Sequence, residues 1–178
     1  MPNEAYLRAS ARSDLSQWVV HFVRTAAMIA PSQVGTATDI LHSILTEGRI
    51  RPSLAEHITK YSPGGATCFY DAPPSVWPEI VQTNPNARQP LGLIVQKMAL
   101  WYLGGRPAIY AELTDPDSWP ASQRFRLINT DLLRQPDPVD WMHEREWRLQ
   151  GSLHLHQPQI PYLWWWPIVP TPEWLPYV

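Results

Sequence analysis

The chain has 178 residues, of which 44% are hydrophobic and 17% are charged, so its composition is that of one globular domain rather than a disordered segment. A formal net charge of −2 excludes the global positive charge that drives non-specific binding to nucleic acid, and the single cysteine excludes an internal disulfide or a multi-cysteine metal site. No run approaches the ~20 apolar residues of a membrane span. We therefore expect a cytoplasmic protein with no membrane partner.

The first half of the chain predicts a strand and then a helix. Residues 16–26 carry β-branched and aromatic side chains suited to a strand. The clearest helix is expected over 36–50, where apolar residues recur at helical spacing. Thr36 and Asp39 resemble a capping box at its start, and Gly48 is typical of a helix end. The apolar stripe of this helix comprises Ile40, Leu41, Ile44 and Leu45.

Strand patterns dominate the rest of the chain. Its expected elements are turn, strand and turn at 62–74, one or two helical turns at 75–82, a buried strand at 90–100, a strand at 107–111, a helical segment at 118–129, a strand at 144–155 and an edge strand at 162–170. This order predicts the α+β class, with a split, mostly antiparallel sheet and peripheral helices. We expect a single domain over 1–178 that ends in a Trp/Pro-rich C-terminal strap at 158–178.

Charged side chains gather in one short run, "DWMHEREWRL", at residues 140–149. Strand alternation would place Glu144, Glu146 and Arg148 on one face. Either these charges form a solvated ion pair on an edge strand, or one glutamate is a catalytic acid. Cys68 has no evident partner for a nucleophile and is interpreted as a small buried residue. No nucleotide-binding glycine motif and no zinc motif occurs, and no metal site is predicted.

The order of several short motifs resembles a known family. The strings are "HF" in the first strand, then "DILHSILTEGRIRPS", "CFYDAP", "PLGLIVQKMALWYLGGRPAIY" and "DWMHEREWRL". Over about residues 16–150 they resemble the AbiGi-like abortive-infection proteins of phage defence. The opening histidine and the closing glutamate strand are also similar to DarT-type ADP-ribosyltransferases. The chain departs from the DarT pattern in having "HFVR" where "H-x-T" is expected.

The resemblance implies an ADP-ribosyltransferase-like fold with NAD, as substrate, bound in the cleft of a split sheet. Glu146 would bond the ribose 2′-hydroxyl as the nicotinamide bond breaks, and Glu144 would orient or deprotonate the acceptor. The cofactor-binding residues implied are His21, Arg49, Arg51 and Tyr70. His21 and Glu146 should then face one cleft from adjacent strands. Glu146→Gln is expected to abolish NAD turnover while leaving the melting temperature nearly unchanged.

The expected acceptor is a single-stranded nucleic acid or a protein, and an antitoxin or other defence partner is a further expectation. Two alternatives stay open. One is a non-catalytic binding or sensor module whose Trp/Pro-rich tail docks a partner. The other is a metal-independent nuclease that uses His21, His143 and Glu146 as general acid and base.

Overall fold

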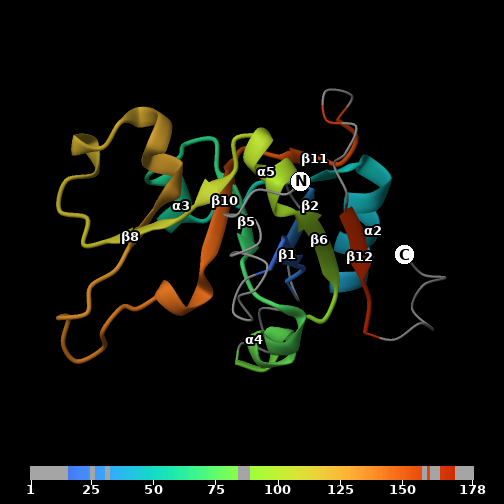
Figure 1. The fold of residues 1–178 in the computed structure, drawn as a ribbon, viewed down its shortest axis with the longest axis horizontal. Coiled ribbons are helices and arrows are strands. Elements are labelled where there is room, and N and C mark those ends of the chain that lie inside the picture. Colours follow the sequence, from blue (N-terminus) through green and yellow to red (C-terminus); the bar gives the residue numbers. More distant parts are fainter. Residues whose placement is uncertain are drawn as a thin grey trace, which may run out of the picture.

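A computed structural model of the chain describes residues 16–24, 27–30, 33–83, 89–157, 160 and 165–170. Its centre is a six-stranded sheet in the order β12-β6-β1-β5-β10-β7, with every neighbouring pair antiparallel (Figure 1). The strands are β12 (Trp165–Ile168), β6 (Gly92–Gln96), β1 (Trp18–Phe22), β5 (Ala66–Tyr70), β10 (Glu146–Gln150) and β7 (Arg106–Pro107). The predicted α+β class with a mostly antiparallel sheet is confirmed, as is the edge position of the last strand.

Shorter strand pairs and helices surround the sheet. The pairs are β4 (Arg49–Ile50) with β11 (Leu153–His154), β2 (Ala27–Ala30) with β3 (Gln33–Gly35), and β8 (Ile109–Ala111) in parallel with β9 (Leu127–Asn129). The α-helices are α2 (Ala37–Glu47), α3 (Glu56–Thr59), α4 (Trp77–Thr83) and α5 (Lys97–Tyr102). The 3₁₀ turns are η1 (Pro74–Val76), η2 (Pro116–Ser118), η3 (Ala121–Arg126) and η4 (Met142–Glu144). None of the helices among the described residues is long and apolar enough to cross a membrane.

Local signals place helix α2 as predicted. The Thr36 hydroxyl accepts from the amide of Asp39, and the Asp39 carboxylate accepts from the amide of Thr36, which completes the capping box. Gly48 ends the helix with a φ of 64°, a left-handed conformation that glycine adopts without strain. The buried side of the helix carries Leu41 and Ile44.

The main core lies on one face of the sheet, called here the core face. Side chains alternate along each strand, so Val19, Phe69 and Trp147 share this face. Leu41 of α2 and Leu100 of α5 belong to the same buried cluster. Burial of such side chains contributes about 1.5–3 kcal/mol each relative to exposure, which makes this face the main source of stability.

The sheet is joined most loosely between β1 and β5. Val20 and Tyr70 are the one pair in register there among the described residues, whereas β1 pairs with β6 along its whole length. The imidazole of His21 crosses this seam, and its Nδ1 lies 2.9 Å from the carbonyl oxygen of Cys68. A side chain thus links the two strands where the backbone ladder has separated.

Several predicted elements differ from the structure. The strand expected over 144–155 divides into β10 and β11, which belong to different sheets, and Glu144 lies in η4. The strand expected over 90–100 ends at Gln96, and α5 begins at Lys97, because an apolar run does not distinguish a buried strand from a helix. The strand expected over 107–111 divides into β7 and β8, which belong to different sheets. Residues 118–129 form a 3₁₀ turn and strand β9 in place of one helix. Of the expected C-terminal strap, residues 158–159, 161–164 and 171–178 lie outside the described residues.

Candidate active site

The second face of the sheet, called here the site face, carries the predicted glutamate. Directly paired residues of neighbouring antiparallel strands point to the same side. Val20 pairs with Tyr70, and Tyr70 pairs with Glu146, so these three side chains share the site face. Cys68 and Arg148 follow by alternation along β5 and β10. The site face therefore collects ionisable groups where the core face is mainly apolar.

Glu146 and Arg148 form a buried ion pair on this face. Nε of Arg148 lies 2.7 Å from Oε1 of Glu146, and the two residues are 2% and 8% exposed, respectively. The guanidinium also donates to the carbonyl oxygen of Leu127 at 2.8 Å. Burial is the largest single effect and lowers the pKa of Arg148, but the charge and hydrogen bond of Glu146, together with Cys68 and Tyr110, raise it overall. The pair is therefore buried, and β10 lies between β5 and β7, so the alternative of a solvated ion pair on an edge strand is wrong.

Cys68 lies beside this carboxylate. Burial raises the pKa of its thiol, and the negative charge of Glu146 and a hydrogen bond to it raise the pKa further. A thiol with a raised pKa stays protonated and is a poor nucleophile. This environment agrees with the interpretation of Cys68 as a structural residue.

Glu144 approaches the site from a turn rather than from the strand. It ends η4, and Arg145, with a φ of 45°, separates it from β10. This left-handed residue breaks the alternation, so the prediction that Glu144 and Glu146 project from one strand is wrong. Glu144 nevertheless joins the site face, because the Tyr70 hydroxyl donates to its Oε1 at 3.3 Å. Tyr70 is thereby placed beside both glutamates, by pairing with one and by a hydrogen bond to the other.

His21 lies on the opposite side of the sheet from Glu146. Strand β5 separates β1 from β10, and His21 alternates with Val20, so its ring packs 5.9 Å from the Phe69 ring on the core face. The expectation that His21 and Glu146 face one cleft from adjacent strands is therefore wrong. Burial lowers the pKa of His21. Because a carbonyl oxygen only accepts, the neutral imidazole carries its proton on Nδ1, which donates to Cys68.

Arg49 and Arg51 are engaged away from the glutamates. Their Nε atoms donate to the Glu47 carboxylate at 3.0 and 3.1 Å, and these bonds lower the pKa of Glu47 to about 2. Ser53, two residues beyond Arg51, pairs with Ala66 at the start of β5, whereas Tyr70 ends that strand. The structure therefore does not bring the two arginines together with Glu144 and Glu146.

Three site residues had no signal in the sequence. Tyr110 of β8 accepts a 2.6 Å hydrogen bond from the backbone amide of Glu146, although 36 residues separate the two. His57 of α3 is exposed, and its pKa is lowered by partial desolvation and by the positive charge of Arg148. Arg24, an exposed residue just after β1, acts electrostatically on His57 and Cys68. The side chain of His143 is outside the described part of the chain, so its predicted role has no counterpart here.

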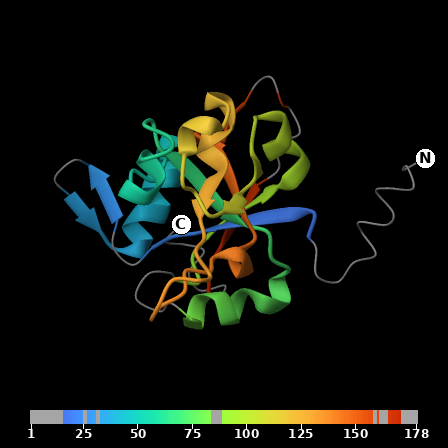
Figure 2. The same cartoon turned by 90° about the vertical axis from the view of Figure 1, so that its left-hand side faces the viewer.

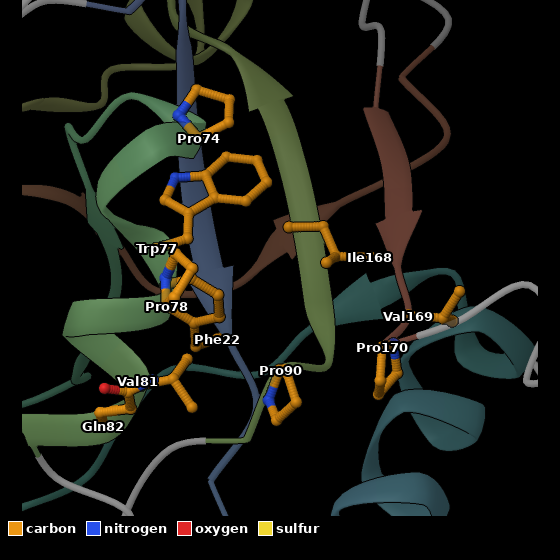
Figure 3. A pocket seen from close by; sticks show the side chains of 10 residues that line it. All are labelled: Phe22, Pro74, Trp77, Pro78, Val81, Gln82, Pro90, Ile168, Val169 and Pro170. Carbon is orange, nitrogen blue, oxygen red and sulfur yellow. The ribbon is translucent and has the colours of Figure 1, made fainter.

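An apolar groove is lined in part by Phe22, a neighbour of Tyr70. It has a volume of about 370 Å³ and lies between α4 and the end of β12. Figure 3 shows Phe22, Trp77 and Val81 on one side of it and Ile168 on the other. Gly92 of β6 lies between Phe22 of β1 and Ile168 of β12 and pairs with both. Because glycine has no side chain, the space between Phe22 and Ile168 stays open. A Cβ at this glycine would collide with the backbone carbonyl of His21, so the close approach of β1 and β6 requires glycine.

Aromatic rings connect the groove to the glutamates. The Phe22 ring lies 6.1 Å from the Trp77 ring and 6.1 Å from the Tyr70 ring, measured between centroids. The Tyr70 hydroxyl then reaches Glu144. Figures 1 and 2 agree in placing the turn at 142–144 next to α4. Phe22, which lines the groove, and Tyr70 beyond it therefore connect a ring bound in the groove to the carboxylate of Glu144.

Comparison with known proteins adds no assignment. No family model matches the chain, and no curated protein and no solved structure matches it.

Proposed function

We propose that the protein is an ADP-ribosyltransferase that cleaves NAD and transfers ADP-ribose to a nucleic-acid base or another macromolecule, in phage defence or as a toxin. The observation that carries the proposal is the Glu146 carboxylate, held at 2.7 Å by Arg148 on the face that also bears Glu144 and Tyr70. An oriented, ionised carboxylate is what a reaction through a positively charged sugar carbon requires.

The proposed step breaks the bond between ribose C1′ and the nicotinamide nitrogen. The electron pair of that bond goes to the nitrogen, which neutralises the ring and leaves positive charge on the sugar. Glu146 bonds the ribose 2′-hydroxyl and stabilises this charge. The lone pair of the acceptor then forms the new bond to C1′, and the acceptor passes its proton to Glu144. Glu144 suits this role because it comes from a separate turn and meets the site from beside β10.

The aromatic groove supports binding of the leaving ring. Nicotinamide in NAD is flat and positively charged, and aromatic faces attract such rings. Trp77 and Phe22 supply those faces, and Tyr70 extends the aromatic surface toward the glutamates. A volume of about 370 Å³ is within the range of small-molecule sites. The groove is therefore the proposed nicotinamide site.

The cation proposed for the pyrophosphate is Arg24 rather than Arg49 or Arg51. Both of the latter neutralise Glu47 and lie toward the other end of β5. Arg24 follows Phe22, which lines the groove, by two residues and is exposed. His21 is proposed to hold the seam between β1 and β5, and with it the split of the sheet that this class of enzyme needs. The role implied for it by the resemblance, direct contact with NAD, is not retained.

Labelled NAD tests the function and identifies the acceptor together. The protein is incubated with NAD that carries its label on the adenine side, together with single-stranded DNA, RNA or cell lysate. We expect label to be transferred to one acceptor class and free nicotinamide to appear in equal amount. An Arg24→Gln variant should raise the KM for NAD, whereas Arg51→Gln should leave it unchanged. Absence of both products with every acceptor would contradict the proposal.

A further inference from the structure

Residues 108–129, called here the arm, clasp the start of β10. The arm comprises β8, η2, η3 and β9, and it forms the upper left part of the molecule in Figure 1. The Tyr110 hydroxyl accepts from the Glu146 amide at 2.6 Å, and the Ala108 amide donates to the Glu146 carbonyl at 2.7 Å. Leu127 accepts from the Arg148 guanidinium at 2.8 Å. The arm thus holds Glu146 through its backbone and through its ion-pair partner.

These hydrogen bonds replace the backbone pairing that β7 does not extend to Glu146. Strand β7 pairs with Trp147 and Arg148 of β10, and its register stops before Glu146. On the other side of β10, Glu146 faces Tyr70, so its amide and carbonyl both point toward the arm. A buried amide without a partner is unfavourable by about 1–3 kcal/mol. Ala108 supplies a donor to the Glu146 carbonyl, and the Tyr110 hydroxyl supplies the acceptor for the Glu146 amide.

The hydrogen bond from the Glu146 amide to Tyr110 is needed because of Arg145, the residue before Glu146. Arg145 has a φ of 45°, a left-handed conformation that is unfavourable for a residue other than glycine. The backbone around Glu146 would therefore tend to rotate if nothing held it. Any rotation of the Glu146 peptide group would swing its carboxylate away from the site face. Burial, reinforced by the charges of Glu146 and Glu144, raises the pKa of Tyr110 to about 12. The phenol therefore keeps its proton, and its oxygen accepts as a neutral group throughout the physiological range.

We propose that Tyr110 is a positioning residue that fixes the backbone of Glu146 at the start of β10. This inference rests on the proposed function for its consequence in catalysis, but the positioning itself is independent of it. Tyr110 does not touch the substrate in this account. It acts through Glu146, so its loss should affect the rate of the chemical step and leave the affinity for NAD unchanged.

Amide hydrogen exchange of the ¹⁵N-labelled protein tests the positioning directly. Tyr110→Phe removes the hydroxyl and keeps the ring, and we expect the Glu146 amide to exchange about fivefold faster or more. The amides of Trp147 and Leu149 report on the fold in the same sample and should keep their protection. Tyr102→Phe is the matched control, because Tyr102 is 74% exposed on α5. Glu146 exchange equal to that of the control, or equal loss at Trp147 and Leu149, would overturn the proposal.

Kinetics separate this inference from the proposed function. If the wild-type protein cleaves NAD, Tyr110→Phe should lower kcat about fivefold to tenfold with KM unchanged, and Tyr102→Phe should alter neither. A raised KM with unchanged kcat would overturn the positioning role. If the wild-type protein does not cleave NAD, the proposed function fails, and hydrogen exchange at Glu146 still decides whether Tyr110 positions it.

Discussion

The guanidinium of Arg148 lies 2.7 Å from the carboxylate of Glu146, two residues earlier on the same strand, and both side chains are buried. Removal of one member of a buried pair leaves the other charge uncompensated and typically costs about 3–5 kcal/mol. The sequence-based expectation that Glu146→Gln leaves the melting temperature unchanged therefore needs revision. The glutamine keeps a hydrogen-bond acceptor, so we expect a loss of about 3 kcal/mol in the free energy of unfolding, measured by urea denaturation.

The second partner supplies the control for this prediction. Glu146→Gln combined with Arg148→Met removes the orphaned charge, and replacement of a buried pair by apolar groups is often close to neutral. The double variant should recover most of the lost stability. Two losses that simply add would show that the pair is not coupled.

Tyr70 and Glu144 are predicted to be coupled by their 3.3 Å hydrogen bond. A double-mutant cycle of Tyr70→Phe and Glu144→Ala measures this coupling in the free energy of unfolding, because each single variant removes the hydrogen bond. We expect an interaction energy of about 0.5–1.5 kcal/mol, the range for a typical hydrogen bond, because the 3.3 Å separation is long for a bond to a carboxylate. A value indistinguishable from zero would mean that Glu144 is not held against the site face.

His21 is predicted to make the protein less stable in mild acid. Its pKa in the folded state is below the ordinary 6.5, mainly because of burial, so the unfolded chain binds the proton more readily. The stability that His21 contributes is present above pH 6.5 and is lost as the pH falls toward the folded-state pKa. His21→Gln keeps a donor for Cys68 but does not titrate, so its stability should fall less than that of the wild type between pH 6.5 and about 5.

The pKa of His57 is also lowered, so the dependence of the free energy of unfolding on pH should become weaker in His21→Gln but should not disappear. The control is His42→Gln, since His42 is exposed on α2. An identical pH dependence of unfolding in wild type and His21→Gln would contradict the assignment of a buried neutral imidazole at the seam.

Glu47 is predicted to stabilise the end of α2 with a different pH window. The Arg51 hydrogen bond lowers its pKa to about 2, so its contribution is present above pH 4.5 and is lost as the pH falls toward 2. The residue is exposed, and solvent screening limits the effect of Glu47→Gln at pH 7 to about 0.5–1 kcal/mol. Thermal unfolding at several pH values measures this. Glu79→Gln, at an exposed position of α4, should show no comparable change.

Features that depend on neighbouring residues could be predicted from the sequence. The capping box of Thr36 and Asp39 and the left-handed Gly48 are set by positions within one turn of α2, and all three were predicted. The place of Glu146 within a strand also followed from local alternation, although that strand was expected to begin at residue 144. The turn that separates Glu144 from that strand did not, because it depends on a positive φ at Arg145, a residue type with no preference for that conformation.

The sequence pattern could not predict which side chains from different strands share one face of the sheet. Whether His21 and Glu146 share a face depends on the order of β1, β5 and β10 and on their registers, and a shift of one residue exchanges the faces. Tyr110 was missed for a related reason. Its partner is a backbone amide 36 residues away. Because nearly every residue has such an amide, the type of the partner residue gives no signal in the sequence.

Release of nicotinamide from NAD is the measurement that tests the central claim most directly. The wild-type protein, the Glu146→Gln variant and the Glu146→Gln/Arg148→Met variant are compared at equal concentration with the acceptor that the labelling experiment identifies. We predict release by the wild type and a loss of about a hundredfold or more in both variants, including the one whose stability is restored. Release at the wild-type rate by a folded variant that lacks the Glu146 carboxylate would contradict the account.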